Sequence, residues 1–170
     1  MMSDLDIRLA RPGDEIHLLA LNDDADRWLV ARGIVPGVPP KPLEEIFASR
    51  IARRVTYLAE RSGEIIGSFT YEDEDDRLWH DLPASAGYVH GLVVRRDCAG
   101  QKIGFRLLAQ AKRIAAERGK ALLRLDCDAE NPQLRAYYEH AGFTYRGDVT
   151  LPHRRASRYE SPVEERDSAG

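Results

Sequence analysis

The stretch YVHGLVVRRDCAGQKIG, residues 88–104, decides the fold, because it joins a strand to a helix through a glycine-containing turn. Its first part, Tyr88–Val94, is rich in β-forming residues and is apolar on both faces around Leu92, Val93 and Val94. Strands that are covered on both sides within a sheet have this composition. We therefore expect a strand in the middle of a sheet.

The turn after this strand predicts a site for an anion. A helix should begin near Gln101 and end at Gly119. Its apolar residues recur at helical spacing: Ile103, Leu107, Ala111, Ile114 and Ala115. N–H groups in a first helical turn have no internal partner and lie at the positive end of the helix dipole, which favours an anion. Lys102, Arg95 and Arg96 add positive charge, although the turn has neither the dinucleotide glycine pattern nor the Gly-Lys-Ser/Thr phosphate loop.

Residues 121–147 add a second strand, a capped helix and a further strand. Ala121–Cys127 alternates apolar residues with a mixed face, as a strand does. Asn131 stands where it can cap a helix, with Pro132 at the first helical position and Gly142 at the end. The expected buried side of this helix consists of Leu134, Tyr137, Tyr138 and Ala141.

These blocks together resemble the GCN5-related N-acetyltransferase (GNAT) family, which binds acetyl-CoA and transfers the acetyl group, usually to an amine. The matching segments are the strand end Leu92–Val94, the loop Ala99–Gly104 and the block Asn131–Phe143. The family loop usually reads Gln or Arg, two residues, Gly, one residue, then Gly or Ala; here Ala99 replaces the first residue and Lys102 the middle glycine. We expect Lys102 to lie in a helical first turn and to offer its N–H without a positive φ.

The resemblance extends from Ile7 to about Asp148. It implies an α/β fold in which a central mixed β-sheet is flanked by helices on both faces. We expect a single domain over residues 1–160 and a disordered tail over residues 161–170.

The resemblance also implies which residues bind the cofactor. The backbone of Val93 and Val94 would face the pantetheine arm and the thioester carbonyl, and the loop N–H groups would face the pyrophosphate. Asn131 would contact the CoA arm. The implied cofactor-binding set is Leu92, Val93, Val94, Gly100, Gln101, Lys102, Ile103, Gly104 and Asn131.

Tyr138 is the candidate general acid, since the resemblance places it near the cofactor sulfur. Attack of an amine on a thioester develops negative charge on the carbonyl oxygen, and the leaving thiolate needs a proton. A phenol, with a usual pKa of about 10, can supply that proton without being ionised beforehand. The alternative is that Tyr138 only packs against its neighbours. Of the two adjacent tyrosines, the motif register favours Tyr138 over Tyr137 as the residue that faces the cleft.

His90 is the first candidate for the general base. The acceptor amine is mostly protonated at neutral pH, and only its neutral form attacks. Imidazole side chains titrate in the physiological range, so a histidine on the central strand suits this role. Asp126, Glu72 or a chain of water molecules are the alternative bases. The simplest alternative role for His90 itself is a purely structural one.

The remaining sequence predicts the flanking elements. Ile7 and Leu9 alternate in a short strand, and Asp14 can cap a helix that follows. A second helix is expected around Leu43, Ile46 and Phe47. The final predicted segments are a hairpin of Val55–Glu60 and Ile65–Tyr71 about the Ser62-Gly63 turn, and a last strand over Arg154–Glu160.

Two loops are candidates for the acceptor side of the site. The Pro/Gly-rich segment 33–42 lies between the first two predicted helices, where the resembled family places part of its acceptor wall. The segment 72–76 reads EDEDD, and an acidic mouth would concentrate a cationic amine. A solvated loop is the alternative for this acidic run.

Composition limits the function classes. The chain has 170 residues and a net charge of -3, which fits one soluble domain and gives no general attraction to nucleic acid. Cys98 and Cys127 provide no disulfide framework, and no His/Cys cluster has zinc spacing, so we expect no metal. The sequence shows no apolar signal segment and no run that could span a membrane, which predicts a cytoplasmic protein without a membrane partner.

The sequence thus predicts an acetyl-CoA-dependent N-acetyltransferase that acts on the primary amine of a small molecule by direct attack in a ternary complex, and a homodimer is possible. Two alternatives stay open: acetylation of a protein or peptide amine, and a noncatalytic CoA-sensing or interaction module. The absence of a convincing Cys/His pair argues against a covalent acyl-enzyme.

Overall fold

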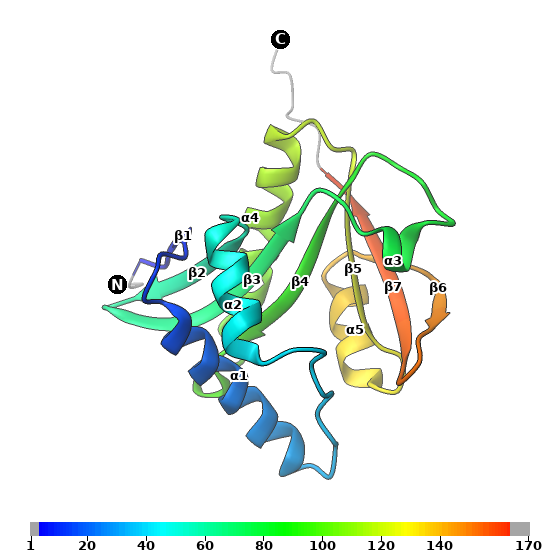
Figure 1. Cartoon of the computed structure of the whole chain (residues 1–170). Helices are drawn as coiled ribbons and strands as arrows, with labels where there is room; N and C mark the ends of the chain where they lie inside the picture. Colours follow the sequence, from blue (N-terminus) through cyan, green and yellow to red (C-terminus); the bar gives the residue numbers. More distant parts are fainter. Residues whose placement is uncertain (1–3, 164–170) are drawn as a thin grey trace. The chain divides into compact units, whose positions relative to one another are not determined.

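The structure is a computed structural model, and it describes residues 4–163 (Figure 1). Its elements in chain order are β1 (Asp6–Leu9), α1 (Glu15–Val30), α2 (Leu43–Ala52), β2 (Thr56–Arg61), β3 (Glu64–Glu72), α3 (Asp76–Trp79), β4 (Ala86–Val94), the 3₁₀ turn η1 (Arg96–Cys98), α4 (Ile103–Glu117), β5 (Leu122–Asp128), α5 (Pro132–His140), β6 (Thr144–Thr150) and β7 (Arg155–Pro162). The described strands form one sheet in the order β1-β2-β3-β4-β5-β7-β6. This mixed sheet confirms the predicted α/β class.

The chain divides into two compact units, which are described separately below. Among the described residues, unit 1 comprises residues 4–70 and 91–107, and unit 2 comprises residues 71–90 and 108–163. The single domain expected over residues 1–160 stays a prediction. β7 continues to Pro162, beyond the expected start of the tail, and residues 164–170 lie outside the described residues.

Unit 1 contains the predicted hairpin. β2 and β3 pair in antiparallel register from Thr56 opposite Thr70 to Arg61 opposite Glu64. The turn residues Ser62 and Gly63 have φ values of 53° and 79°. A two-residue type I′ turn requires positive φ at both of its central positions, which explains the glycine at position 63. β1 extends this hairpin by pairing with β2, and the buried core beside it comprises Ala10, Leu18, Ile51 and Leu58.

Asp14 stands at the N-cap of α1 as predicted, but its side chain makes no capping hydrogen bond to the helix. Instead, its carboxylate accepts hydrogen bonds from Arg8 Nη1 at 2.8 Å and from the Arg11 backbone N–H at 2.7 Å. The hydrogen bond from Arg8 is the main reason that the pKa of Asp14 lies below its usual range. The carboxylate therefore ties the start of α1 to β1.

Unit 2 contains the second half of the predicted pattern. β5 pairs antiparallel with β7, and β7 pairs antiparallel with β6. The Asn131 side chain accepts a hydrogen bond from the Leu134 N–H at 3.1 Å, Pro132 is the first residue of α5, and Gly142 follows the helix with a φ of 94°. The predicted cap, start and end of this helix are thus confirmed.

No helix between residues 4 and 163 is both long and apolar enough to cross a lipid bilayer.

Candidate active site

His90 lies on β4 just beyond the point where the described pairing with β5 ends. The two strands run parallel, with described pairs from Ala86 opposite Leu122 to Tyr88 opposite Arg124. Gly91 follows His90 with a φ of 60°, a backbone conformation that favours glycine. A glycine at positive φ within a strand is typical of a bulge, and bulges often redirect side chains beside active sites. The sequence analysis did not use Gly91, although its position inside an apolar strand was a readable signal.

His90 belongs to a cluster with two carboxylates within unit 2. Its Nε2 atom lies 3.6 Å from Oδ2 of Asp75. One imidazole nitrogen of His90 and one carboxylate oxygen each of Asp75 and Asp126 lie within 4.8 Å of one another. The His90 side chain is 26% exposed, whereas those of Asp75 and Asp126 are 9% and 10% exposed. The sequence analysis considered His90 and Asp126 separately, and the structure brings them together. It also adds Asp75 from the acidic run.

The two carboxylates are held by different partners. Asp75 Oδ1 accepts a hydrogen bond from the Leu78 N–H at 3.3 Å and thereby caps α3. Burial raises the pKa of Asp75, while the nearby His90 opposes that rise. Asp126 forms an ion pair with Arg154, with 3.0 Å between Oδ2 and Nη2. The cluster is therefore a largely enclosed group that can both accept a proton and attract a cation.

Tyr138 lies on the inner side of α5, as the motif register predicts. Its residue is 5% exposed, and its ring contacts Phe143 and Tyr159 at centroid distances of 6.1 and 6.2 Å. Burial is the main reason that the pKa of Tyr138 is raised, so the phenol stays protonated at neutral pH. The adjacent Tyr137 is half-buried. Tyr138 and His90 both lie in unit 2, and their roles as acid and base stay predictions.

The two cysteines do not suit nucleophilic catalysis. Burial raises the pKa of Cys127 to about 12 and also raises that of Cys98. A thiol with a raised pKa carries little thiolate at neutral pH, and the thiolate is the reactive form. Direct transfer without a covalent acyl-enzyme stays a prediction.

The predicted anion loop lies in unit 1, and its geometry corrects two expectations. α4 begins at Ile103 rather than near Gln101. Lys102, expected in a helical first turn without positive φ, has a φ of 61°, and Gly100 has a φ of 81°. The expectation was wrong because Lys102 precedes the helix and still belongs to the turn. It therefore occupies the left-handed region that the glycine of the family loop can adopt without strain.

Replacing Lys102 with glycine should stabilise the protein. A non-glycine residue in the left-handed region costs about 1–2 kcal/mol, part of which is offset by the greater freedom of glycine in the unfolded chain. We expect a gain of up to about 1 kcal/mol in the free energy of unfolding, measured by chemical denaturation. Lys102→Ala removes the same charge but keeps Cβ, so it should show no gain. Equal stabilities of the two variants would contradict the assigned backbone conformation.

Charged neighbours hold the anion loop. Arg61 donates a hydrogen bond to Gln101 Oε1 at 2.7 Å. Arg95 pairs with Asp97 and Glu64 at 2.6 and 3.3 Å, so much of its charge is already balanced. Lys102 is exposed and directly precedes α4, so it adds positive charge beside the first-turn N–H groups, where an anion is favoured.

The other predicted cofactor residues divide between the units. Leu92, Val93 and Val94 form the half-buried end of β4 in unit 1, and the Arg95 N–H that follows donates to the Ile66 carbonyl at 2.8 Å. Asn131 lies in unit 2, where its side-chain oxygen already caps α5. Within unit 1 the strand end and the loop residues Gly100, Gln101, Lys102, Ile103 and Gly104 are joined by η1. Contact of these residues with a cofactor stays a prediction.

Comparisons with known proteins agree on one family. Residues 20–143 match the model of the acetyltransferase (GNAT) family. The uncharacterized N-acetyltransferase YesJ of Bacillus subtilis (strain 168) is 35% identical over 74 residues, which span 43% of this chain and only 41% of that relative.

Solved structures share the fold over nearly the whole chain. A GNAT-family acetyltransferase from Listeria monocytogenes 4b F2365 is 23% identical and covers 95% of this chain and 98% of its own, with a TM-score of 0.74. PaiA N-acetyltransferase from Thermoplasma acidophilum, solved in complex with coenzyme A, is 18% identical and covers 91% of this chain and 98% of its own, with a TM-score of 0.70. The family model spans most of the sequence, and the chain therefore belongs to the GNAT acetyltransferase family.

Proposed function

We propose that this protein is an acetyl-CoA-dependent N-acetyltransferase that acetylates the primary amine of a small molecule by direct attack in a ternary complex. The observation that carries the proposal is the cluster of His90, Asp75 and Asp126. Membership of the GNAT family supports acetyl transfer as the reaction. The structure of PaiA N-acetyltransferase was solved in complex with coenzyme A, which supports the choice of acetyl-CoA as the cofactor.

The cluster supplies what an amine acceptor needs. A primary ammonium ion is attracted by the two carboxylates, and it must lose a proton before its nitrogen lone pair can attack. His90 takes that proton on its ring, and Asp75 beside Nε2 stabilises the imidazolium that results. Asp126 adds negative charge but is already engaged with Arg154. His90 is therefore the better base of the two.

Unit 1 supplies the groups for the cofactor. The N–H groups in the first turn of α4, with Lys102 before them, bind the pyrophosphate of acetyl-CoA. A backbone N–H at Val93 or Val94 donates to the thioester carbonyl oxygen, where negative charge develops during attack. This assignment follows the family pattern of these segments.

The reaction proceeds in two bond changes without an acyl-enzyme. The neutral amine nitrogen forms a bond to the carbonyl carbon, and the resulting intermediate expels the CoA thiolate as the C–S bond breaks. Tyr138 donates a hydrogen bond, and finally its proton, to the leaving sulfur. The attacking nitrogen carries one proton more than the amide that it becomes, and it releases that proton to solvent, from which Tyr138 is reprotonated. The proton that His90 removed from the ammonium ion also leaves to solvent, which restores the neutral imidazole.

The enclosure of the carboxylates favours a small acceptor over a protein. Side chains that are 9% and 10% exposed, as in Asp75 and Asp126, are accessible to a slender ammonium group but present little area to a folded surface. Two carboxylates with one compensating Arg154 also leave room for a positive charge. A peptide amine is the competing substrate that the experiment must include.

The test combines ligand binding with turnover. Thermal unfolding is measured with acetyl-CoA, CoA and, as a control nucleotide, NADH. A ligand at 100 times its Kd stabilises the native state by about 2.7 kcal/mol, which raises Tm by about 5–11 °C in a domain of this size. We expect this shift with both CoA ligands and none with NADH. Turnover is then followed as thiol release with small amines and with lysine and N-terminal peptides.

Faster turnover of a small amine than of any peptide would support the proposal. Faster turnover of a peptide would show that the acceptor is a peptide or protein amine and not a small molecule. A CoA-dependent shift in Tm without turnover of any amine would favour a noncatalytic CoA-binding module, and the absence of any shift at saturating ligand would overturn the cofactor assignment.

A further inference from the structure

Two buried arginines hold the segment between β3 and β4, which carries Asp75 and α3. Arg124 on β5 is 2% exposed and Arg158 on β7 is 6% exposed. Charged side chains are rarely buried so deeply, because the loss of hydration must be offset by hydrogen bonds and counter-charges. The sequence analysis gave neither arginine a role, so their partners are informative.

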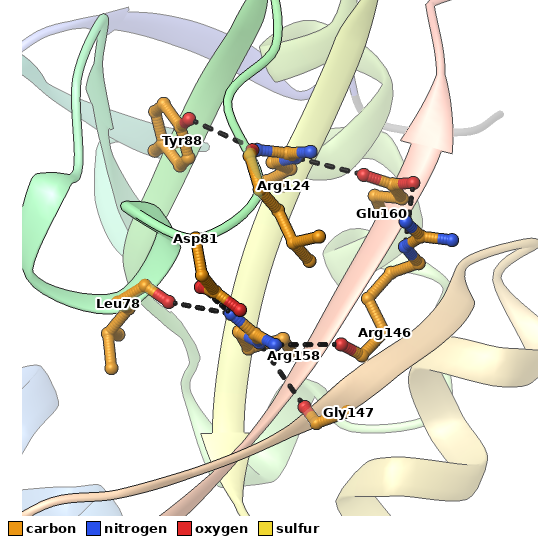
Figure 2. Close-up of polar contacts among 9 residues, drawn as sticks. Leu78, Asp81, Tyr88, Arg124, Arg146, Gly147, Arg158 and Glu160 are labelled. Carbon is orange, nitrogen blue, oxygen red and sulfur yellow. Dashed lines mark hydrogen bonds and ion pairs between the residues drawn. The ribbon is translucent and has the colours of Figure 1, made fainter.

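Arg158 connects α3 to β6. Its Nη1 donates to the Leu78 carbonyl at 3.0 Å and to Asp81 Oδ1 at 2.7 Å, as Figure 2 shows. Its Nη2 donates to the Arg146 carbonyl at 3.1 Å, and its Nε to that of Gly147 at 3.4 Å. The hydrogen bond from Arg158 is the main reason that the pKa of Asp81 lies below its usual range. One guanidinium thus fixes backbone from two separate segments.

Arg124 holds the other end of the same segment. Its Nη1 donates to the Leu82 carbonyl at 2.6 Å. The same atom donates to Tyr88 Oη at 3.4 Å, and Nε pairs with Glu160 at 2.9 Å (Figure 2). Glu160 also pairs with Arg146 at 3.1 Å. The two arginines therefore contact the segment on both sides of Trp79.

Trp79 lies against both arginines. The Cζ atoms of Arg124 and Arg158 lie 4.2 and 5.2 Å from its ring centroid, within the range of cation–π attraction. Trp79 itself is 2% exposed and packs in a cluster with Leu78 and Tyr88. Packing of this kind leaves α3 little freedom to move relative to β5 and β7.

A continuous series of contacts leads from Arg158 to the proposed base. Arg158 binds the carbonyl of Leu78, and the N–H of the same residue donates to Asp75 at 3.3 Å. Asp75 in turn lies 3.6 Å from His90 Nε2. Displacement of Leu78 would therefore displace the carboxylate that faces the imidazole.

We propose that Arg158, supported by Arg124, is a positioning residue that fixes α3 and so holds Asp75 against His90. An apolar side chain of similar volume could fill the same space at lower desolvation cost, but it could not bind the Leu78 carbonyl. This inference rests on the proposed role of His90 as the base. It adds a residue that acts without touching a substrate.

The central experiment is a double-mutant cycle between Arg158→Met and Asp75→Asn, with turnover measured below the unfolding temperature of every variant. Asparagine removes the carboxylate charge but can still cap α3. Because a misplacement of about 1 Å can cost about 10²-fold in rate, we expect Arg158→Met to lower kcat by about 10- to 100-fold. If Arg158 acts through Asp75, the double variant loses no more than the worse single variant. Losses that multiply would overturn the proposal.

Two further variants separate positioning from general destabilisation. Arg155→Met is the matched control on the same strand, since the Arg155 side chain is 50% exposed and pairs with Glu130 and Asp148. We expect it to leave kcat within about twofold. Arg158→Lys keeps one donor for the Leu78 carbonyl and should recover part of the loss. If Arg158→Met does not fold, Arg158→Lys replaces it in the test. Full activity both in Arg158→Lys and in the double variant Arg158→Lys with Asp75→Asn would overturn the proposal.

A readout without substrate distinguishes this inference from the proposed function. The ring signals of His90 are recorded by NMR at one pH in each variant. Arg158→Met and Asp75→Asn should shift these signals, whereas Arg155→Met should not. Unchanged signals in both Arg158 variants would overturn the positioning role even if the enzyme is active. Shifted signals with no turnover on any amine would support positioning and reject the catalytic proposal.

Discussion

His90→Gln should lower kcat by about 10²- to 10⁴-fold, which is the usual contribution of a positioned general base. Glutamine retains hydrogen-bonding groups of similar reach but cannot take a proton near neutral pH. The His90 side chain is 26% exposed, so its replacement should change stability little. The measurement is kcat and kcat/KM for the best amine between about pH 5 and 10, the range that contains the ordinary histidine and amine titrations.

His80→Gln is the matched control, because His80 is an exposed histidine at the end of α3 in the same unit. Its kcat should match that of the unmodified protein. Asp126→Asn tests the alternative base and should reduce the rate less than His90→Gln, since Asp126 is engaged by Arg154. A His90→Gln variant that keeps the pH–rate profile of the unmodified enzyme would remove His90 from the mechanism.

Local signals account for the parts of the fold that were predictable. The Ser62-Gly63 hairpin turn and the Asn131-Pro132 helix start each depend on a few adjacent residues with restricted backbone or hydrogen-bonding preferences. The sequence therefore predicts these elements without knowledge of their tertiary neighbours. Lys102 shows the limit of such signals, because its positive φ is set by the path from η1 into α4 and not by its own preference.

The site was predictable only in part, for a different reason. His90 and Asp126 are recognisable as titratable residues on strands, but Asp75 is one carboxylate in an acidic run that normally lies in solvent. Its burial depends on α3, and α3 depends on Arg158 and Arg124. Arginines in strands are usually exposed, so nothing near them in the sequence indicated that these two would be buried.

Tyr138→Phe should lower kcat by about 10²-fold, at the low end for a positioned proton donor. A thiol has a usual pKa of about 8.5, and a phenol of about 10. Burial raises the pKa of Tyr138 further, so full proton transfer to the thiolate is uphill. The phenol therefore acts mainly as a hydrogen-bond donor to the sulfur as the C–S bond breaks, which limits the size of the effect.

The substitution removes one oxygen and keeps the ring contacts with Phe143 and Tyr159. The free energy of unfolding should change by no more than about 1 kcal/mol, and the affinity for acetyl-CoA should be unchanged, because the effect is confined to the transition state. Tyr137→Phe is the matched control one position earlier and should retain full kcat. Single-turnover kinetics are required so that chemistry limits the observed rate. Full turnover by Tyr138→Phe under those conditions would show that Tyr138 packs α5 against β7 and takes no part in departure of the thiolate.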